Sequence, residues 1–302
     1  MLSKTIRIPG TTANCGPGFD AVGMACTIYN YLTIEETGNH EIHVEVEGEG
    51  IGQIPDSEGN IAVQAALSVF DRVHYDHTGF VMKMKNAVPL ARGLGSSAAA
   101  IVGGLVAANC FTGEQLSTAE LLDMATAIEG HPDNVAPALL GGVTVSFMDD
   151  EMHAKSLRFV PPTPLAMVVA VPDFSLATSA ARQVLPKHVA YQDAVFNVSR
   201  VALLIGSLCS GDYRYLSSGL EDKLHQPYRK PLIKGIDSVF VAAQQAGAIG
   251  TAISGSGPCI IAFTTKNAQK IGKAMVLAFQ SQDIGARYYV LELDTQGAQE
   301  VL

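Results

Sequence analysis

The sequence contains no tryptophan, and charged residues make up only 16% of its 302 positions. It lacks any uninterrupted apolar stretch of about 18 residues, the length that a membrane-spanning helix needs, and its N-terminus lacks a signal-peptide pattern. Its five cysteines are widely spaced and include no Cys-x-x-Cys pair. These absences predict a cytoplasmic protein with reduced, mostly buried thiols and no membrane partner.

The net charge is −9, because 29 acidic residues outnumber 20 basic ones. We therefore expect no broad binding of nucleic acid or anionic membranes, and any phosphate ligand must be held by local donors, helix ends and a cation. Apolar residues make up 48% of the chain, and 29 glycines favour close packing of a compact fold. A chain of 302 residues is long enough for two domains.

Residues 89–99, Pro-Leu-Ala-Arg-Gly-Leu-Gly-Ser-Ser-Ala-Ala, form the most informative stretch, which we call the glycine loop. The alternation of residues 81–85 before it predicts a strand, and the small-residue run 98–108 after it predicts a closely packed helix. Gly93 and Gly95 permit close approach of the backbone to a ligand. The helix start offers free N–H groups and a positive dipole end to an anion.

Three interpretations of the glycine loop follow from the pattern alone. It could be an ordinary strand–turn–helix corner capped by Ser96 or Ser97. It could be a Gly-x-Gly-x-x-Ala dinucleotide fingerprint, but the preceding strand carries lysines and Glu114 lies in a polar turn, which argues against this. It could be a phosphate loop, although not of the Walker type, because no G-x-x-x-x-G-K-[ST] occurs in the chain.

Two further segments carry polar side chains in unusual places. Residues 11–20 form a loop rich in Gly, Pro and Asn, in which Asn14 and Asp20 would ordinarily bond to their own backbone. Residues 117–120 form a capping box that opens a helix ending at Glu129. A carboxylate at a helix C-terminus is electrostatically unfavourable unless a cation lies beside it, whereas a solvated Glu129 would need no such partner.

The glycine loop resembles the ATP-binding motif of the GHMP kinases, a family that includes galactokinase, mevalonate kinase and homoserine kinase. Residues 250–263 resemble the third motif of that family, with Ser256 where many members have Ala. Four other segments, residues 11–20, 129–142, 172–186 and 222–229, resemble the homoserine kinases within it. The resemblance covers nearly the whole chain.

The resemblance implies an α+β fold with the two-domain GHMP kinase architecture. Residues 1–160 would form the ATP-binding domain, similar to domain 2 of ribosomal protein S5, and residues 161–302 a ferredoxin-like domain. A charged and proline-rich segment near residue 160 suits the boundary. The implied activity is phosphorylation of the L-homoserine side-chain hydroxyl by ATP with Mg²⁺, giving O-phospho-L-homoserine for threonine synthesis.

The resemblance also assigns roles to residues. The ATP-binding residues are Pro89, Leu90, Ala91, Arg92, Gly93, Leu94, Gly95, Ser96, Ser97, Ala98 and Ala99. Ser97 and Glu129 would bind Mg²⁺, whose preferred ligands are hard oxygens. The third-motif loop, Gly255, Ser256 and Gly257, would pack beside the glycine loop and help to close the site.

The implied substrate-binding residues are Asn14, Asp20, His131, Asn134, Arg182 and Arg229. The two arginines suit a carboxylate, because paired guanidinium groups bind it with bidentate geometry, and Asp20 suits an ammonium group. His131, Asp133 and Asn134 are the catalytic candidates. His131 could act as a general base or only position the substrate, and whether Asp133 reaches the hydroxyl also stays open.

Two other functions remain as alternatives. Another GHMP kinase could phosphorylate a different carboxylate-bearing alcohol such as mevalonate, and the acidic partner for an ammonium group, Asp20, distinguishes homoserine from it. A non-catalytic sensor could bind ATP and a metabolite without turnover, although such proteins usually lose the metal or phosphate-loop residues that this chain keeps. The sequence leaves both a monomer and a homodimer open.

Overall fold

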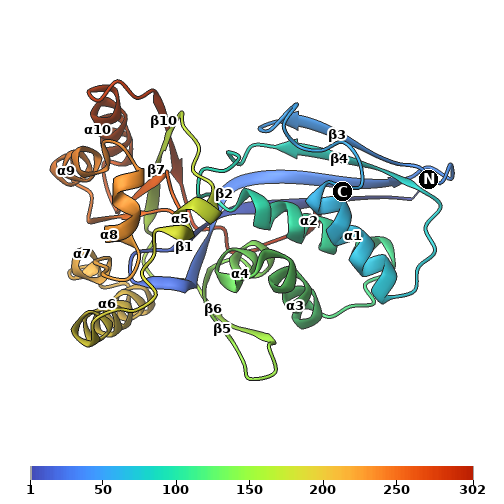
Figure 1. Ribbon diagram of the computed structural model, residues 1–302, viewed down its shortest axis with the longest axis horizontal. Coiled ribbons are helices and arrows are strands. Elements are labelled where there is room, and N and C mark those ends of the chain that lie inside the picture. The colour runs from blue at the N-terminus through green and yellow to red at the C-terminus, as the bar shows by residue number, and fades with distance from the viewer. Residues whose placement is uncertain (1, 302) are drawn as a thin grey trace.

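The computed structural model describes residues 2–301, which form two lobes, each built on its own sheet (Figure 1). The first lobe holds a seven-stranded sheet in which the order β11-β1-β2-β4-β3 is extended by β5 on β2 and β6 on β5. Its strands are β1 (Ser3–Asn14), β2 (Gly18–Glu36), β3 (Ile42–Gly48), β4 (Phe80–Asn86), β5 (Val143–Met148), β6 (Ala154–Phe159) and β11 (Gln299–Val301). Within this described sheet only β3 and β4 pair in parallel.

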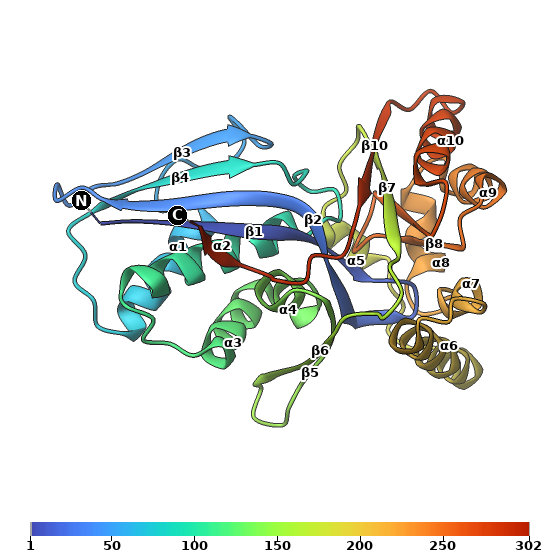
Figure 2. The ribbon, with the colours of Figure 1, turned by 180° about the vertical axis from the view of Figure 1, so that it is seen from behind.

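Four helices lie along one face of this sheet, as Figures 1 and 2 show from opposite sides. They are α1 (Ile61–Arg72), α2 (Ser96–Phe111), α3 (Thr118–Glu129) and α4 (Pro132–Leu140). Helix α2 is buried on nearly all sides, with 12 of its 16 residues inside the core. A Cβ at Gly104 would lie 2.1 Å from the Ala62 carbonyl oxygen of α1, so glycine permits this close crossing. The start of α2, where the glycine loop ends, is therefore firmly placed.

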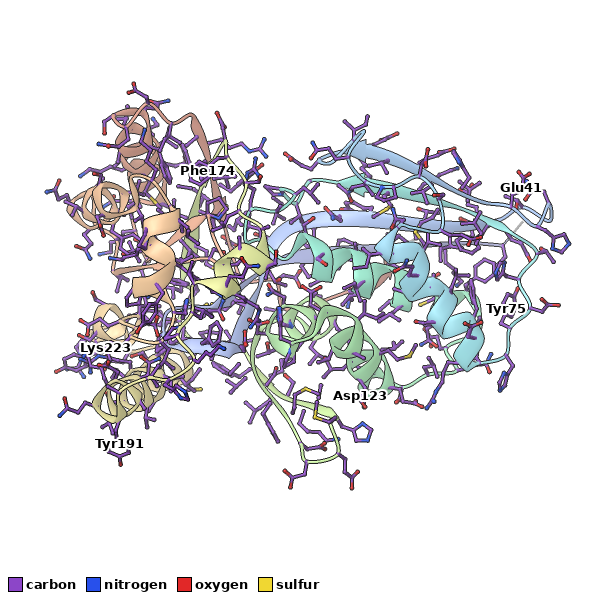
Figure 3. The ribbon with its side chains drawn as sticks, in the orientation of Figure 1. Glu41, Tyr75, Asp123, Phe174, Tyr191 and Lys223 are labelled. Atoms are coloured by element: carbon purple, nitrogen blue, oxygen red, sulfur yellow. The ribbon has the colours of Figure 1, made fainter. Side chains whose placement is uncertain are left out.

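Helix α3 is fixed at both of its ends and along its length. The predicted capping box is present, because Ser117 and Glu120 exchange hydrogen bonds at the helix start. The Asp123 carboxylate, labelled in Figure 3, accepts from the Ala154 N–H at 2.7 Å and so ties α3 to the β5–β6 hairpin. Gly130 stops the helix in the left-handed conformation, as predicted, directly after Glu129.

The second lobe holds a four-stranded antiparallel sheet in the order β10-β7-β9-β8. Its strands are β7 (Ala166–Pro172), β8 (Gly250–Ile253), β9 (Ile260–Thr264) and β10 (Ala286–Leu291). Its helices are α5 (Thr178–Gln183), α6 (Tyr191–Ser210), α7 (Leu216–Gly219), α8 (Gln226–Arg229), the 3-10 helix η1 (Lys230–Leu232), α9 (Ile236–Ala246) and α10 (Ala268–Gln280). The predicted α+β class and the two-lobed architecture are confirmed.

One hydrophobic core joins the two lobes. Val22 and Met24 from the first part of β2 belong to the same buried cluster as Met167 and Val169 of β7. Strand β2 runs from the first lobe into this junction (Figure 2). The link between β6 and β7 contains residue 160, where the sequence places the domain boundary. Strand β11, inside the range predicted for the second domain, pairs with β1 of the first sheet.

Helix α6 is long and apolar enough to span a membrane by length and composition alone. Two of its polar side chains bond to the segment that follows α7, because Asn197 donates to Asp222 at 2.9 Å and Arg200 donates to Glu221 at 2.9 Å. Leu204 and Leu208 are buried in the core that joins the lobes. Tyr191, at the start of the helix, points to solvent (Figure 3). These contacts suit a helix that packs on the second lobe.

Candidate active site

A cavity of about 420 Å³ lies where the two lobes meet. The first lobe lines it with the glycine loop, the end of α3 and the start of α4. The second lobe contributes Thr178 and Arg182 of α5, Arg229 of α8, and Gly255 and Ser256 of the third-motif loop. The fold therefore brings to one cavity segments that are up to about 240 positions apart in the sequence, as the contact between Asn14 and Gly255 shows.

The glycine loop presents an uncapped helix start to this cavity. Gly95 is the N-cap of α2 in the left-handed conformation, with φ 67°, and no side chain caps the helix. The interpretation as an ordinary serine-capped corner is therefore wrong. Ser96 and Ser97 line the cavity beside the free backbone N–H groups of the first turn. This geometry suits a bound anion such as phosphate.

The residues on either side of the third-motif loop bond directly to the glycine loop. Ser254 Oγ donates to the Gly93 carbonyl oxygen at 2.6 Å, and the Cys259 N–H donates to the Arg92 carbonyl oxygen at 3.1 Å. A Cβ at Gly93 would lie 2.2 Å from the Ser254 carbonyl oxygen. Only glycine fits at that contact, so residues from both lobes fix the shape of the loop together.

Ser97 and Glu129 meet at the edge of the cavity. Ser97 Oγ donates to Glu129 Oε2 at 2.8 Å. Burial raises the pKa of Glu129, against the opposing hydrogen bond from Ser97, and no salt bridge to Glu129 occurs among residues 2–301. A half-buried carboxylate beside a hydroxyl, without a salt-bridge partner among the described residues, is a donor set of hard oxygens that fits Mg²⁺.

His131, Asp133 and Asn134 form a connected group at the start of α4. The His131 Nδ1 is hydrogen-bonded to Asp133 Oδ1, and the Asp133 side chain is only 1% exposed. Burial acts to lower the pKa of His131, but the hydrogen bond and charge of Asp133 outweigh it, so the pKa is raised. Asn134 Oδ1 accepts from Thr11 Oγ1 at 2.8 Å, which fixes the amide orientation.

Asp20 and Arg182 form a bidentate ion pair across the lobes. The Arg182 Nη2 and Nη1 donate to the two carboxylate oxygens of Asp20 at 2.7 and 3.0 Å. Asn14 supports this pair, because its Oδ1 accepts from the Asp20 N–H at 3.0 Å and its Nδ2 donates to the Gly255 carbonyl oxygen at 2.9 Å. The local backbone contact expected for this segment is thus present for Asn14, whereas the Asp20 carboxylate bonds instead to Arg182 of the other lobe.

Arg229 is a buried cation that lines the cavity and is 1% exposed. Its Nε donates to the Ala181 carbonyl oxygen at 3.2 Å and its Nη1 to the Gly255 carbonyl oxygen at 3.1 Å. Among the described residues no carboxylate lies within 4.0 Å of it. Burial, followed by the charge of Arg182, lowers the pKa of Arg229. An unpaired buried guanidinium is costly, and an anion entering the cavity would remove that cost.

The structure does not bring every predicted residue to the cavity. Leu94, Ala98 and Ala99 are packed in the core, and their side chains do not line it. Pro89 and Gly257 are also absent from its lining. Any contact of Leu94, Ala98 or Ala99 with a ligand would therefore use backbone atoms.

The sequence pattern did not reveal the far end of the cavity. The loop after β3, the start of α1 and strand β4 supply its lining residues Gln53, Ile54, Pro55, Asn60, Ile61, Met84 and Asn86. Asn86 Oδ1 is buried without a hydrogen-bond partner among the described residues. The pattern of these segments indicated only a helix and a strand, and nothing in it distinguished the residues that face a ligand.

Two family models match the chain. The model for the GHMP kinases N terminal domain matches residues 60–142, and the model for the GHMP kinases C terminal domain matches residues 204–280. The chain belongs to the GHMP kinase family. The N-terminal match contains the glycine loop, Glu129 and the His131 group, and the C-terminal match contains Arg229 and the third-motif loop.

Relatives of this GHMP kinase match it over nearly their whole length. The homoserine kinase of Moorella thermoacetica is 48% identical over 279 residues, which cover 92% of this chain and 93% of the relative. That of Carboxydothermus hydrogenoformans is 45% identical, with 98% and 96% covered. The crystal structure of homoserine kinase from Cytophaga hutchinsonii is 31% identical, has a TM-score of 0.91, and is matched over 97% of its chain and 99% of this one.

Proposed function

We propose that this chain is a homoserine kinase, which transfers the γ-phosphoryl group of ATP to the side-chain hydroxyl of L-homoserine. The product is O-phospho-L-homoserine, the precursor of threonine. The observation that carries the proposal is Arg229, a buried guanidinium that lines the cavity without an acidic partner among residues 2–301. It suits a substrate carboxylate, which sugar substrates lack.

The ATP phosphates would lie at the uncapped start of α2. Ser97 and Glu129 would hold Mg²⁺ there, and when bound the ion supplies positive charge to the phosphate oxygens. The base of ATP would occupy the far end of the cavity, where the unpartnered Asn86 Oδ1 is available as an acceptor. The exocyclic amino group of adenine can donate to it, whereas guanine has a carbonyl oxygen at the same position.

Homoserine is a zwitterion, and the Asp20–Arg182 pair matches its two charges. We infer that the substrate ammonium binds Asp20 while its carboxylate binds Arg182 and Arg229. The substrate ammonium then takes the place of Arg182 beside Asp20, and the substrate carboxylate takes the place of Asp20 beside Arg182. Every charged group in the site therefore keeps a partner of opposite charge. Asp20, His131 and Asp133 each offer one polar atom, and these three atoms lie within 4.8 Å of one another. The ammonium site is therefore next to the group at the start of α4.

His131 and Asn134 would orient the substrate hydroxyl. The contact with Asp133 raises the pKa of His131, which favours the protonated ring, a hydrogen-bond donor, over the neutral one. In phosphoryl transfer, positioning and charge stabilisation supply most of the rate. A dedicated general base is therefore not required. We further propose that the enzyme works in the cytoplasm without a nucleic-acid or membrane partner.

The proposal is tested by ADP release from Mg-ATP with L-homoserine, mevalonate, galactose and shikimate as acceptors. We expect kcat/KM for L-homoserine to exceed that of the other acceptors by about 100-fold or more, because only homoserine matches both charges of the site. GTP should replace ATP poorly. A preference for mevalonate would favour the other carboxylate-alcohol kinase, and tight binding of ATP without turnover would favour the sensor.

Gly95→Ala tests the phosphate site. A Cβ at Gly95 would lie 1.9 Å from Thr11 Oγ1, and Thr11 also orients Asn134. Because a small misplacement of reacting groups is costly, we expect the KM for ATP to rise about tenfold or more. The control is Gly113→Ala, where φ is +86° and nothing lies within 4 Å of the added Cβ.

Both substitutions place a Cβ in the left-handed conformation, which costs about 1–2 kcal/mol of stability. Thermal unfolding should therefore show a loss in both variants, whereas ATP titration should show a raised KM for Gly95→Ala alone. Equal KM values for the two variants would argue against phosphate binding at the start of α2.

A further inference from the structure

Behind Arg229 lies a fully buried histidine, His225, which precedes α8 and is 0% exposed. Its Nε2 lies 2.6 Å from the Gly16 carbonyl oxygen. A carbonyl oxygen can only accept, so Nε2 carries the proton and Nδ1 of the neutral ring is an acceptor. The Arg229 Nη1 lies 3.3 Å from that Nδ1 and donates to it. The ring thus connects the turn between β1 and β2, just before Asp20, with the arginine that lines the cavity.

Aromatic contacts keep this ring and both arginines in one stack. The Phe19 ring is stacked on His225, with centroids 5.2 Å apart and an interplanar angle of 27°. The guanidinium carbons of Arg229 and Arg182 lie 5.2 and 5.6 Å from the Phe19 centroid. A Cβ at Gly16 would lie 2.2 Å from the Leu220 carbonyl oxygen, so the loop is pressed against the second lobe. Phe19 thus holds His225 beside both arginines.

Burial favours the neutral ring of His225. Burial lowers the pKa of His225, and the nearby Arg229 lowers it further, while Asp222 and Asp20 oppose this. The Asp222 Oδ2 lies 3.5 Å from Nε2, the nitrogen that already carries a proton, and it accepts from the backbone N–H groups of His225 and Gln226 at 2.9 and 2.6 Å. A second proton on His225 would sit on Nδ1, directly facing the Arg229 guanidinium.

We propose that His225 is a positioning residue for the substrate carboxylate: its neutral ring accepts from Arg229 Nη1, donates to the Gly16 carbonyl, and thereby aims Arg229 into the cavity. This inference rests on the proposed homoserine kinase function. It gives a role to a residue that touches neither the cavity nor the phosphates. The effect of losing it should appear in homoserine binding, through Arg229, and not in ATP binding.

Two substitutions separate the contacts of the ring. His225→Gln places an amide near the Nε2 position, which keeps a donor for Gly16 but removes the acceptor at Nδ1. His225→Asn places its oxygen near the Nδ1 position, which keeps the acceptor for Arg229 but loses the donor to Gly16. If positioning of Arg229 is what matters, the asparagine variant is the conservative one.

The readout is kcat/KM for L-homoserine divided by kcat/KM for 3-aminopropan-1-ol, the same alcohol without the carboxylate. In His225→Gln we expect this ratio to fall about tenfold, the effect of one hydrogen bond to a charged group. The KM for ATP and the activity with 3-aminopropan-1-ol should stay within about threefold of the wild type, and His225→Asn should keep the ratio within about threefold.

An unchanged ratio in His225→Gln, or an equal fall in both variants, would overturn the inference. If His225→Gln fails to fold, His225→Asn still decides, because a fall of about tenfold in its ratio would contradict the role of the Nδ1 acceptor. Failure of the wild-type enzyme to phosphorylate homoserine would instead overturn the proposed function, so the two failures are distinguishable.

Discussion

Replacing Arg229 by alanine is expected to raise the KM for L-homoserine by about 100-fold or more, while the KM for ATP changes by less than about threefold. The substitution removes a buried cation that lines the cavity and has no carboxylate partner within residues 2–301. Without it the substrate carboxylate would be buried with fewer charged donors, a loss of about 2–5 kcal/mol. Steady-state titration of each substrate measures the effect.

Matched variants and substrates sharpen this test. Arg229→Lys keeps the charge but not the planar fork, so its KM should lie between those of the wild type and Arg229→Ala. Arg200→Ala is the control, because Arg200 pairs with Glu221 on the second lobe and does not line the cavity. In Arg229→Ala the preference for homoserine over 3-aminopropan-1-ol should collapse. Equal losses for homoserine and ATP would contradict the assignment of Arg229.

The second large effect is expected for Glu129→Gln, which should lower kcat by about 100-fold or more at saturating substrates. The substitution keeps an oxygen that can accept from Ser97 but removes the negative charge that would hold Mg²⁺. The Mg²⁺ concentration needed for half-maximal activity should also rise. Initial rates measured over a Mg²⁺ titration give both quantities.

Stability measurements separate this loss from misfolding. Because burial raises the pKa of Glu129, the folded protein binds a proton more readily than the unfolded chain does. This group therefore lowers stability as the pH rises from the ordinary glutamate pKa through the raised one, and its charge is unfavourable at neutral pH. Glu129→Gln should thus keep or raise the unfolding temperature at pH 7. A variant that keeps wild-type kcat would contradict the metal-binding role, and one that unfolds earlier would contradict the unfavourable charge inferred for Glu129.

Local features of the site could be predicted because local chemistry encodes them. Gly93 and Gly95 have φ values of 82° and 67°, which few other residues adopt, so their positions in the sequence mark the loop. The capping box at Ser117 and the stop at Gly130 likewise delimit the helix, and so place Glu129 at its end. In each case the local backbone conformation requires a particular type of residue, and that requirement involves only residues a few positions apart in the sequence.

Contacts between the lobes could not be predicted in the same way. Asp20 and Arg182 were assigned to opposite ends of the substrate, yet they pair with each other across 162 positions of sequence. The unpartnered Asn86 Oδ1 and the neutral His225 also depend on how distant segments dock. Neither a hydrophobic periodicity nor a short motif predicts how segments far apart in the sequence pack together. The pairing of strand β11 with the first sheet was not predicted for the same reason.

The most direct test is a crystal structure of the whole chain with L-homoserine, Mg²⁺ and a non-hydrolysable ATP analogue. We expect the triphosphate against the start of α2, the ion between it and Glu129, and the homoserine carboxylate on Arg182 and Arg229 with its ammonium on Asp20. A triphosphate bound away from the glycine loop, or a homoserine that contacts neither arginine, would contradict the proposed function.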